Sequence, residues 1–268
     1  MIPSLFVAHG SPLVAIEQSE YGSFLEQLGG IIEKPNAIVI FSAHWESDTQ
    51  MVSDIGEYDM IYDFRGFPDE LFRVKYPAKG DHALSQKIQN LLTESGIPYE
   101  VEQHRGLDHG SWTILKRIYP KADIPVIAMS VNPNISPEKQ FQIGKALSSL
   151  RRDGVLIIGS GVTVHNFGLF QVRDNPAVHE AVMKFENWIE QQLHAWDISA
   201  LFNYEKQAPN ADLAVPPNGK EHFVPLFYAM GAAANRPTVT TLHQSWIVNV
   251  MANSVYQFNW EVFMADEL

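Results

Sequence analysis

Ile38-Val39-Ile40-Phe41-Ser42-Ala43 is an uninterrupted apolar run that narrows to two small residues, and His44 follows it directly. A run of this length, rich in β-branched side chains, is typical of a strand buried on both faces of a sheet. Similar runs recur along the chain. The four strands predicted in this way span residues 5–8, 37–42, 125–131 and 155–159.

Segments with helical patterns separate these strands. Residues 81–95 begin with an Asp that can cap a helix, and residues 136–153 begin with Ser-Pro-Glu, a typical first turn. Further helices are predicted at 112–119, 176–196 and 220–234, the last ended by Asn235-Arg236-Pro237, and strands within 238–260. The polar stretch 205–219 is expected to be a loop that forms a lid or rim in front of His222.

The alternation of buried strands with amphipathic helices predicts the fold class. Strands that alternate with helices form a largely parallel sheet with helices on both faces. We therefore expect one α/β domain over residues 1–268, with a central, largely parallel or mixed sheet flanked by helices. A chain of 268 residues is within the range of a single domain of this class.

Composition narrows the classes of partner and of active site. The formal net charge of -12 would repel a phosphate backbone, so nucleic acid is not expected as a partner. The chain contains no cysteine, which excludes disulfides, thiolate metal sites and a cysteine nucleophile. A metal ion would have to be bound by histidine, aspartate or glutamate.

The first residues, Met1-Ile2-Pro3-Ser4, lack the basic segment and apolar core of a secretory signal. No apolar run in the sequence approaches the ~20 residues of a membrane-spanning helix. We therefore expect a cytoplasmic protein that has no membrane partner.

Three histidines follow predicted strands. His9 comes directly after the first strand, His44 after the second, and His165 four residues after Gly161. Because parallel strands bring their carboxyl ends to one edge of the sheet, these imidazoles are expected to converge there. Converging neutral imidazoles are a natural site for Zn²⁺ or Fe²⁺. The glycines beside them, Gly10 and Gly161, are expected to let the backbone approach a bound ligand.

Two more histidines are candidates for the same site. In the pair Glu221-His222, near the start of a predicted helix, either side chain could point inward. His109 follows Asp108 in a glycine-flanked segment that opens another predicted helix, where it could face a ligand, cap the helix or pair with Asp108. No role is assigned to the remaining histidines, which are His82, His104, His179, His194 and His243.

Several common catalytic motifs are absent from the sequence. There is no glycine-rich dinucleotide motif after a strand, no phosphate-binding P-loop and no His-Glu-x-x-His zinc motif. Gly159-Ser160-Gly161 follows a strand, but its spacing differs from that of a hydrolase nucleophile. Ser160 is therefore not expected to act as a nucleophile.

Six blocks of sequence, in order along most of the chain, carry a resemblance to a known family. They are Ala8-His9-Gly10-Ser11-Pro12, Ser42-Ala43-His44-Trp45, Asp63-Phe64-Arg65-Gly66-Phe67-Pro68, Leu107-Asp108-His109-Gly110-Ser111-Trp112, Val164-His165-Asn166 and Glu221-His222-Phe223-Val224-Pro225-Leu226. Together they resemble the 4,5-DOPA extradiol dioxygenase family. That family belongs to the class III extradiol ring-cleavage dioxygenases, which are related to protocatechuate 4,5-dioxygenase.

The resemblance implies a site and a reaction. It implies one divalent metal ion per chain, Fe²⁺ in active members and often Zn²⁺ in purified bacterial ones, bound by His9, His44 and His222. His165 would lie at or beside the metal, and His109 and His165 would be the acid and base. The substrates would be a catechol such as L-DOPA and O₂. Class III enzymes usually bind iron through two histidines and one carboxylate, whereas the family's pattern at Glu221-His222 favours the histidine.

Other readings of the same residues remain open. A zinc-dependent amide or ester hydrolase would need the same imidazoles and one general base. A metal-binding interaction module of this fold would need no turnover. Aromatic residues near the motifs are candidates to line the ring of a substrate, and they are Trp45, Phe64, Phe67 and Trp112. The sequence is compatible with a monomer or with a small homo-oligomer.

Overall fold

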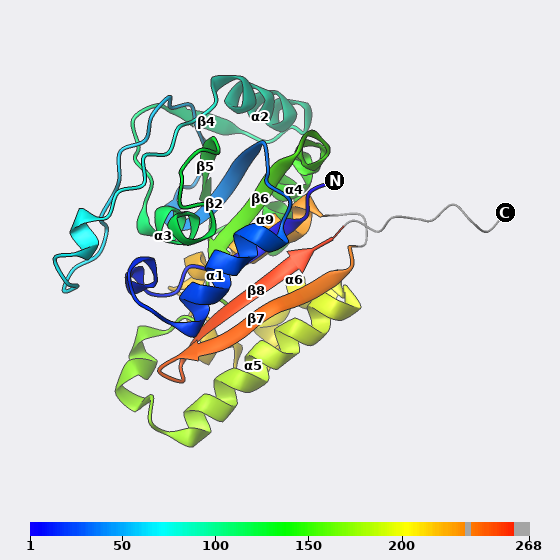
Figure 1. Cartoon of the computed structure of the whole chain (residues 1–268). Coiled ribbons are helices and arrows are strands. Elements are labelled where there is room, and N and C mark those ends of the chain that lie inside the picture. The colour runs from blue at the N-terminus through cyan, green and yellow to red at the C-terminus, as the bar shows by residue number, and fades with distance from the viewer. Residues whose placement is uncertain (234–236, 260–268) are drawn as a thin grey trace.

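The computed structural model describes residues 1–233 and 237–259, and its centre is one eight-stranded sheet (Figure 1). The strands lie in the order β4-β3-β5-β2-β6-β1-β8-β7. Their bounds are β1 Ser4–Ala8, β2 Ala37–Glu46, β3 Gln50–Ser53, β4 Tyr99–Glu102, β5 Val126–Val131, β6 Val155–Gly161, β7 Val239–Ile247 and β8 Met251–Phe258. The α/β class predicted from the sequence is confirmed.

The sheet is mixed, and its four central strands are parallel. β2 pairs in parallel with β5 and β6, and β6 pairs in parallel with β1. β8 is antiparallel to both β1 and β7, and β3 is antiparallel to β5. The pairs Ala8–Gly161 and Ser42–Ser160 align the carboxyl ends of β1, β2 and β6 at one edge of the sheet.

Helices cover both faces of this sheet. In Figure 1 α1 and α3 lie in front of the sheet, α4, α5 and α9 lie behind it, and α2 lies at its top edge. The helix bounds are α1 Glu20–Ile31, α2 His82–Glu94, α3 His109–Ile118, α4 Pro137–Ala146, α5 Pro176–Ala195 and α9 Pro225–Ala232. Alternate strand residues serve two apolar cores, so Ile40 packs on the side of α1 and α3 while Phe41 packs on the other.

The four predicted strands are present, and two of them extend past their predicted carboxyl ends. β6 extends two residues past residue 159, and β2 extends four residues past residue 42. The register of β2 against β5 shifts between Phe41 and Glu46, which indicates a bulge. His44 therefore lies in the irregular last part of a strand and not after it. Bulges re-aim side chains, and this one turns His44 to the carboxyl edge.

Two predicted helices agree with the structure, and a third begins earlier than predicted. Asp81 caps α2 and Asn175 caps α5, which ends at Trp196 in the left-handed region. Asp108 caps α3, so this helix starts at His109 and not at residue 112. The earlier start places His109 at the first position of the helix.

The two other predicted helices are broken. The helix predicted over 136–153 ends at Ala146 and continues as a 3₁₀ segment, η3 Ser148–Asp153. The helix predicted over 220–234 is a 3₁₀ turn, η5 Lys220–His222, followed by α9. Pro225 lacks an amide hydrogen and starts α9, which explains the break. Ala234, Asn235, Arg236 and Trp260 lie outside the described residues.

The segment 205–219 is not the plain loop that the sequence predicts. It contains two short helices, α7 Tyr204–Gln207 and α8 Ala211–Ala214. The carbonyl oxygen of Ala214 accepts a hydrogen bond from the backbone amide of His165 at 3.0 Å, and that of Leu213 accepts one from Asn166 Nδ2 at 2.9 Å. These bonds fix the segment against the residues that follow β6.

Strands β3 and β4 and helix α1 were not among the predicted elements. Each of these strands has four residues, too few for a clear pattern. α1 contains Gly22, Gly29 and Gly30, which lower helix propensity. A Cβ on Gly29 would lie 2.1 Å from the carbonyl oxygen of Ile118, so this glycine permits α1 to pack closely against α3.

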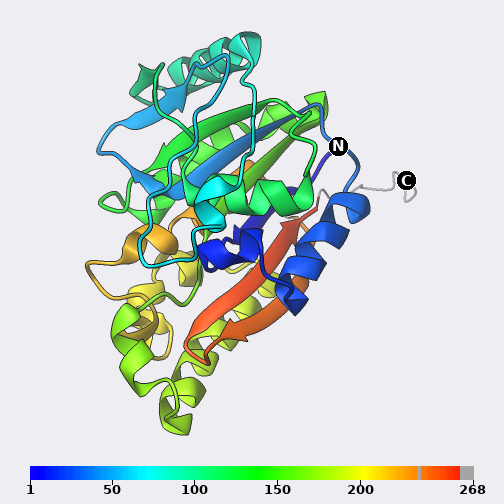
Figure 2. The same ribbon diagram turned by 60° about the vertical axis from the view of Figure 1, so that its left-hand side comes forward.

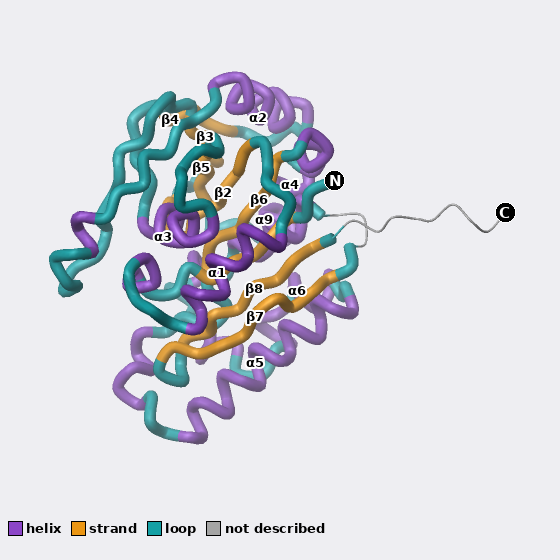
Figure 3. The backbone as a smooth tube through the Cα atoms, in the orientation of Figure 1, coloured by secondary structure: helices purple, strands orange, loops and turns teal. Residues whose placement is uncertain are grey.

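β7 and β8 form a long hairpin beside α1 (Figure 2). Its turn contains Val248 and Asn249, both with positive φ, and Val250 N donates to Ile247 O at 3.2 Å. At the other side of the molecule, the segment between β3 and α2 is mostly irregular (Figure 3). Long irregular segments of this kind are often functional. In the described part of the chain, every helix is too short or too polar to cross a membrane.

Candidate metal centre

Three of the predicted ligands, His9, His44 and His222, meet at the carboxyl edge of the central strands. One ligand nitrogen of each lies within 4.8 Å of the others, and Nε2 of His9 is 3.1 Å from Nε2 of His44. Nitrogens bound to one ion at about 2.1 Å lie about 3–4 Å apart, so the spacing is close to that of a metal site. His9 and His222 are buried, and His44 is partly exposed.

The other ring nitrogen of each histidine faces an oxygen atom. His9 Nδ1 lies 3.2 Å from Ser160 Oγ, and His222 Nδ1 lies 2.8 Å from Glu221 Oε1. His44 Nδ1 lies 3.5 Å from Asp63 Oδ2. An acceptor at Nδ1 keeps the proton there and leaves Nε2 free for a metal ion, as in known histidine metal sites. The donor set therefore fits a divalent cation.

Ser160 fixes the tautomer of His9. Its hydroxyl donates a hydrogen bond to the carbonyl oxygen of Gly110 at 2.5 Å, so it can only accept from His9 Nδ1. Ser160 is fully buried, and its hydroxyl already donates one hydrogen bond and accepts another. This agrees with the expectation that it is not a nucleophile.

His165 lies beside His222. The two rings stack with centroids 3.6 Å apart and an angle of 10° between their planes. His165, Glu221 and His222 form a second group of possible metal ligands. One ligand atom of each lies within 4.8 Å of the others. Because Glu221 Oε1 faces Nδ1 of His222, we expect His222 to offer its other nitrogen to the centre and Glu221 to orient the ring.

His109 faces the centre from the first turn of α3. Its ring centroid lies 3.9 Å from that of His44 and 5.6 Å from that of His9. Its Nδ1 lies 2.9 Å from Asp63 Oδ1, which also accepts a hydrogen bond from the backbone amide of His109 at 3.0 Å. His109 therefore pairs with Asp63 and not with Asp108.

Asp108 has a structural role next to the centre. It is buried, and its Oδ1 accepts from Ser42 Oγ at 2.6 Å and from the amide of Ser111 at 3.2 Å. Arg105 donates both to Asp108 Oδ2 at 3.3 Å and to the carbonyl oxygen of His44 at 2.9 Å. This network joins the start of α3 to the end of β2, and so holds His44 near His109.

The sequence analysis expected Gly161 to make room for a bound ligand. In the structure it makes room for another part of the chain instead. A Cβ on Gly161 would lie 2.1 Å from the carbonyl oxygen of His222, which accepts a hydrogen bond from Val162 N at 2.7 Å. Gly10 has a φ of 61°, and a Cβ there would lie 2.9 Å from Asn253 Oδ1. Both glycines allow the segments that carry the histidines to approach their neighbours closely.

Burial keeps the imidazoles neutral. Burial, together with neighbouring histidines, lowers the pKa of His44 and of His165 to about 4. Burial also lowers the pKa of His9 and of His222 well below the usual value. The pKa of Asp63 is lowered to about 2, because hydrogen bonds from His109 outweigh the opposing effect of burial. Near neutral pH these four imidazoles are therefore neutral and Asp63 is ionised.

A cavity of about 500 Å³ opens beside the histidines. Phe64 and Phe67 line it, as expected, whereas Trp45 and Trp112 do not. Arg105 lies over the ring of Trp45 at 5.1 Å, and Trp112 is buried and donates to Ile61 O at 3.0 Å. The full lining is His9, Gly10, Ser11, Pro12, His44, Asp63, Phe64, Phe67, His109, His165, Phe167, Phe170, His222, Ile247 and Met251.

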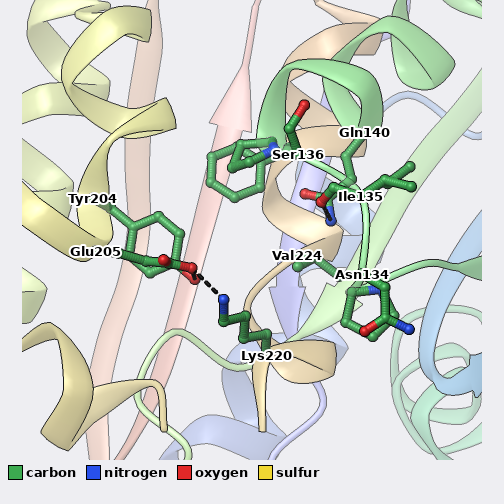
Figure 4. Close-up of a pocket in the computed structure, with 11 residues that line it drawn as sticks. Asn134, Ile135, Ser136, Gln140, Tyr204, Glu205, Lys220 and Val224 are labelled. Carbon is green, nitrogen blue, oxygen red and sulfur yellow. Dashed lines mark hydrogen bonds and ion pairs between the residues drawn. The ribbon is translucent and has the colours of Figure 1, made fainter. Parts of the chain in front are cut away.

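A smaller cavity of about 250 Å³ lies between α4 and the segment around α7 (Figure 4). Glu205 and Lys220 form an ion pair on its wall. Gln140 and Tyr204 also line it, and no histidine does. Because its two charges neutralise each other and it holds no imidazole, this cavity is not the candidate metal centre.

The sequence prediction gave no role to Asp63, Phe167 and Phe170, which line the main cavity. It also missed Ser160, which contacts His9 without lining the cavity. Asp63 lies within one of the sequence blocks, but it follows no strand. The five histidines that were given no role all lie outside the lining of this cavity.

Comparison with known proteins places this geometry in a family. The family model described as the catalytic LigB subunit of aromatic ring-opening dioxygenase matches residues 3–259. The chain belongs to this family. It is therefore a member of the extradiol ring-opening dioxygenases, which are oxidoreductases, and this favours the dioxygenase reading over a hydrolase or an interaction module.

Relatives within the LigB family include plant and bacterial enzymes. The chain is 39% identical to the 4,5-DOPA dioxygenase extradiol of Mirabilis jalapa, over 94% of this chain and 95% of that protein. It is 40% identical to the protein of the same name from Beta vulgaris, over 95% and 96%. The Escherichia coli K12 protein of that name is 32% identical over 89% and 88%.

A solved structure shares the LigB fold seen here. The crystal structure of an uncharacterized protein from Escherichia coli K12 superposes with a TM-score of 0.77 and 28% identity. The match covers 97% of this chain and 100% of that one. The resemblance inferred from the six sequence blocks is thus confirmed over nearly the whole chain.

Proposed function

We propose that this LigB-family chain opens the ring of a catechol beside its two hydroxyl groups, at one divalent metal ion bound by His9, His44 and His222. The observation that carries the proposal is the orientation of these three imidazoles. Each has an oxygen atom near Nδ1, and one ligand nitrogen of each lies within 4.8 Å of the others. The names of the plant and bacterial relatives make L-DOPA the first catechol to test.

The metal would be Fe²⁺ or Zn²⁺, both of which histidine nitrogens bind well. When bound, it would supply open coordination positions for the catechol and O₂ and would carry charge between them. The protein would supply the geometry. His9 comes from the end of β1, His44 from the bulge of β2 and His222 from η5, so three separate segments hold the ion.

His109 is the proposed base. Its Nδ1 donates to Asp63, which leaves Nε2 as a hydrogen-bond acceptor. His109 also lies at the wall of the cavity, where a catechol hydroxyl could reach it. We propose that Nε2 takes a phenolic proton and that Asp63 stabilises the imidazolium that forms. General base catalysis of this kind typically contributes about 10²–10⁴-fold.

His165 is the proposed second proton carrier. Burial and neighbouring histidines lower its pKa to about 4, so it is neutral near pH 7, can accept a hydrogen bond from the substrate and readily passes on any proton that it receives. Its stacking on His222 holds its ring in place. In the reaction both atoms of O₂ enter the product, one in a new carboxylate and one in a semialdehyde.

The experiment is an oxygen-uptake assay with protein reconstituted with Fe²⁺ and, separately, with Zn²⁺. A panel of catechols that includes L-DOPA should give oxygen consumption together with a product that absorbs visible light. His9→Ala and His44→Ala variants should lose both metal binding and uptake. The proposal fails if no catechol in the panel supports oxygen uptake with either metal while the metal is shown to be bound.

A further inference from the structure

Besides the histidines, the lining of the cavity is mostly apolar and comes from two parts of the chain. Phe64 and Phe67 lie in the segment between β3 and α2, and their rings lie 5.3 Å apart. The second apolar group combines the segment after β6 with the β7–β8 hairpin. Its apolar members are Phe167, Phe170, Ile247 and Met251. A substituent on a bound ring would therefore contact mainly carbon atoms.

Within residues 1–233 and 237–259, the lining of the cavity contains an acidic side chain but no basic lysine or arginine. Apart from the imidazoles, the one ionisable side chain of its lining is Asp63, and neither lysine nor arginine occurs in that lining among the described residues. Arg105 lies nearby, but it is engaged by Asp108 and the carbonyl oxygen of His44. Arg65 lies in the chain between Phe64 and Phe67, is exposed, and is not part of the lining.

Phe167 extends this apolar character to the mouth of the cavity. It is 69% exposed, which is unusual for a phenylalanine. Its ring packs edge-on against His165 at 4.7 Å and lies 5.6 Å from the ring of Phe170. An exposed aromatic ring at the rim of an apolar cavity is a feature that a ligand can cover.

We propose that this site prefers catechols with an uncharged, apolar side chain to catechols that carry an amino-acid or carboxylate group. The inference rests on the proposed function and refines its substrate class. A carboxylate that enters this cavity would lose water without gaining a cationic partner, and it would meet the carboxylate of Asp63. A hydrocarbon chain would instead bury its surface against the phenylalanines.

The test compares three catechols that share the ring and a three-carbon chain at the same position. They are 4-propylcatechol, 3-(3,4-dihydroxyphenyl)propanoate and L-DOPA. With the metal-loaded enzyme we expect kcat/KM to be about tenfold or more higher for 4-propylcatechol than for either charged compound, a difference of about 1.4 kcal/mol. The measurement is initial oxygen uptake at several concentrations of each compound.

Two outcomes separate this inference from the proposed function. If all three compounds are opened and a charged one has the highest kcat/KM, the inference is wrong and the proposed function stands. If none is opened by protein with bound metal, the proposed function fails and the inference fails with it.

A pair of variants tests whether the aromatic rim causes the preference. Phe167→Ser should lower the ratio of kcat/KM for 4-propylcatechol to that for the propanoate several-fold. Val172→Ser is the matched control, because Val172 is 43% exposed at the end of the same 3₁₀ segment, η4 Phe167–Val172, but does not line the cavity. Equal ratios in both variants would contradict a role for the rim.

A third variant tests a hidden recognition of carboxylate. Arg65→Gln should leave the order of the three substrates unchanged, since Arg65 is not part of the lining. A selective loss of activity toward the propanoate and L-DOPA in this variant would show that Arg65 swings in to bind their carboxylates. That result would overturn the inference.

Discussion

Asp63 approaches the histidines from the irregular segment between β3 and α2, and its two oxygens contact different partners. Oδ1 accepts two hydrogen bonds from His109, while Oδ2 lies 3.5 Å from His44 Nδ1. One carboxylate thus orients both a proposed base and a proposed metal ligand. Because both of its oxygens face histidines that we assign to the reaction, we expect Asp63 to act as a positioning residue.

Asp63→Asn should lower kcat about 100-fold or more with a smaller effect on KM. An amide NH₂ next to His109 Nδ1 would favour the tautomer that has its proton on Nε2, and the base would be lost. Steady-state kinetics with a catechol measure the effect, and Asp69→Asn, in the same segment but outside the lining, is the control. A kcat within twofold of the parent would contradict this role.

Gly161→Ala should weaken metal binding about 10–100-fold, the range seen when residues that orient ligands are changed. The new Cβ would lie 2.1 Å from the carbonyl oxygen of His222 and would push η5 away from the end of β6. Competition with a chelator measures the affinity. Gly30→Ala is the matched control, because a Cβ there would meet no atom within 4 Å.

At this scale the sequence could identify histidines but not their partners. His9, His44 and His165 follow apolar runs, and that pattern was sufficient to predict that they converge. Asp63 follows no strand, and Phe167 and Phe170 lie in a 3₁₀ segment without a clear period. Their positions depend on how distant segments pack, which no local pattern encodes.

Among the secondary-structure elements, α5 and β8 share a buried carboxylate. Glu186, on α5, is 3% exposed, and its Oε1 accepts hydrogen bonds from Ser254 at 2.5 Å and Tyr256 at 2.7 Å. Its Oε2 has no hydrogen-bond partner among the described residues. Burial raises the pKa of Glu186, although the hydrogen bonds act in the opposite direction.

This raised pKa predicts a pH-dependent stability. Between the unfolded pKa of about 4.5 and the higher folded value, the folded state holds a proton that the unfolded state has lost. The contribution of Glu186 is therefore complete below about pH 4.5 and is lost as the pH rises through that window. Each unit of raised pKa corresponds to about 1.4 kcal/mol.

Glu186→Gln should consequently stabilise the protein at pH 8 and leave its stability nearly unchanged at pH 4.5, since the amide stays neutral at both. Urea unfolding at the two pH values measures the difference. Glu180→Gln, an exposed position on the same helix, is the control. A loss of stability at pH 8 in Glu186→Gln would contradict the argument.

The helices and strands also show where sequence patterns fail. Capping residues located the starts of α2 and α5 correctly, because a cap is a local interaction. The breaks after α4 and before α9 could not be predicted in this way. In both places the spacing of apolar residues in the sequence continues as in an unbroken helix. The bulge in β2 depends on its pairing with β5, and so it could not be predicted from residues 37–46 alone.

On the scale of the whole molecule, a metal ion would join segments far apart in the chain. It would link β1, β2 and η5, so binding should stabilise the folded state. Stabilisation is about 2.7 kcal/mol at a free metal concentration 100 times Kd, which corresponds to a rise in Tm of about 5–10 °C. Thermal unfolding with and without a chelator measures it.

His222→Ala should abolish that rise in Tm. His104→Ala, an exposed histidine outside the cavity, should keep it. An equal rise in both variants would mean that the metal binds elsewhere on the chain.

The sequence predicted the fold class correctly, but it did not predict the order of the strands in the sheet. Buried strands that alternate with helices indicate an α/β sheet, and that expectation is confirmed. The position of the hairpin was not predictable, because the pairing of β8 with β1 joins residues about 250 positions apart. Nothing in either segment alone specifies that partner.

Because β1 lies between β6 and β8, the strand of this sheet that is synthesised first is also among the last to be enclosed. Its β6 edge is covered only after more than half of the chain has been synthesised, and its β8 edge stays uncovered until residues 251–258 emerge. During translation this apolar strand offers free backbone groups to any extended segment nearby. Nascent chains of this enzyme should therefore depend on chaperones more than those of proteins whose first strand pairs early.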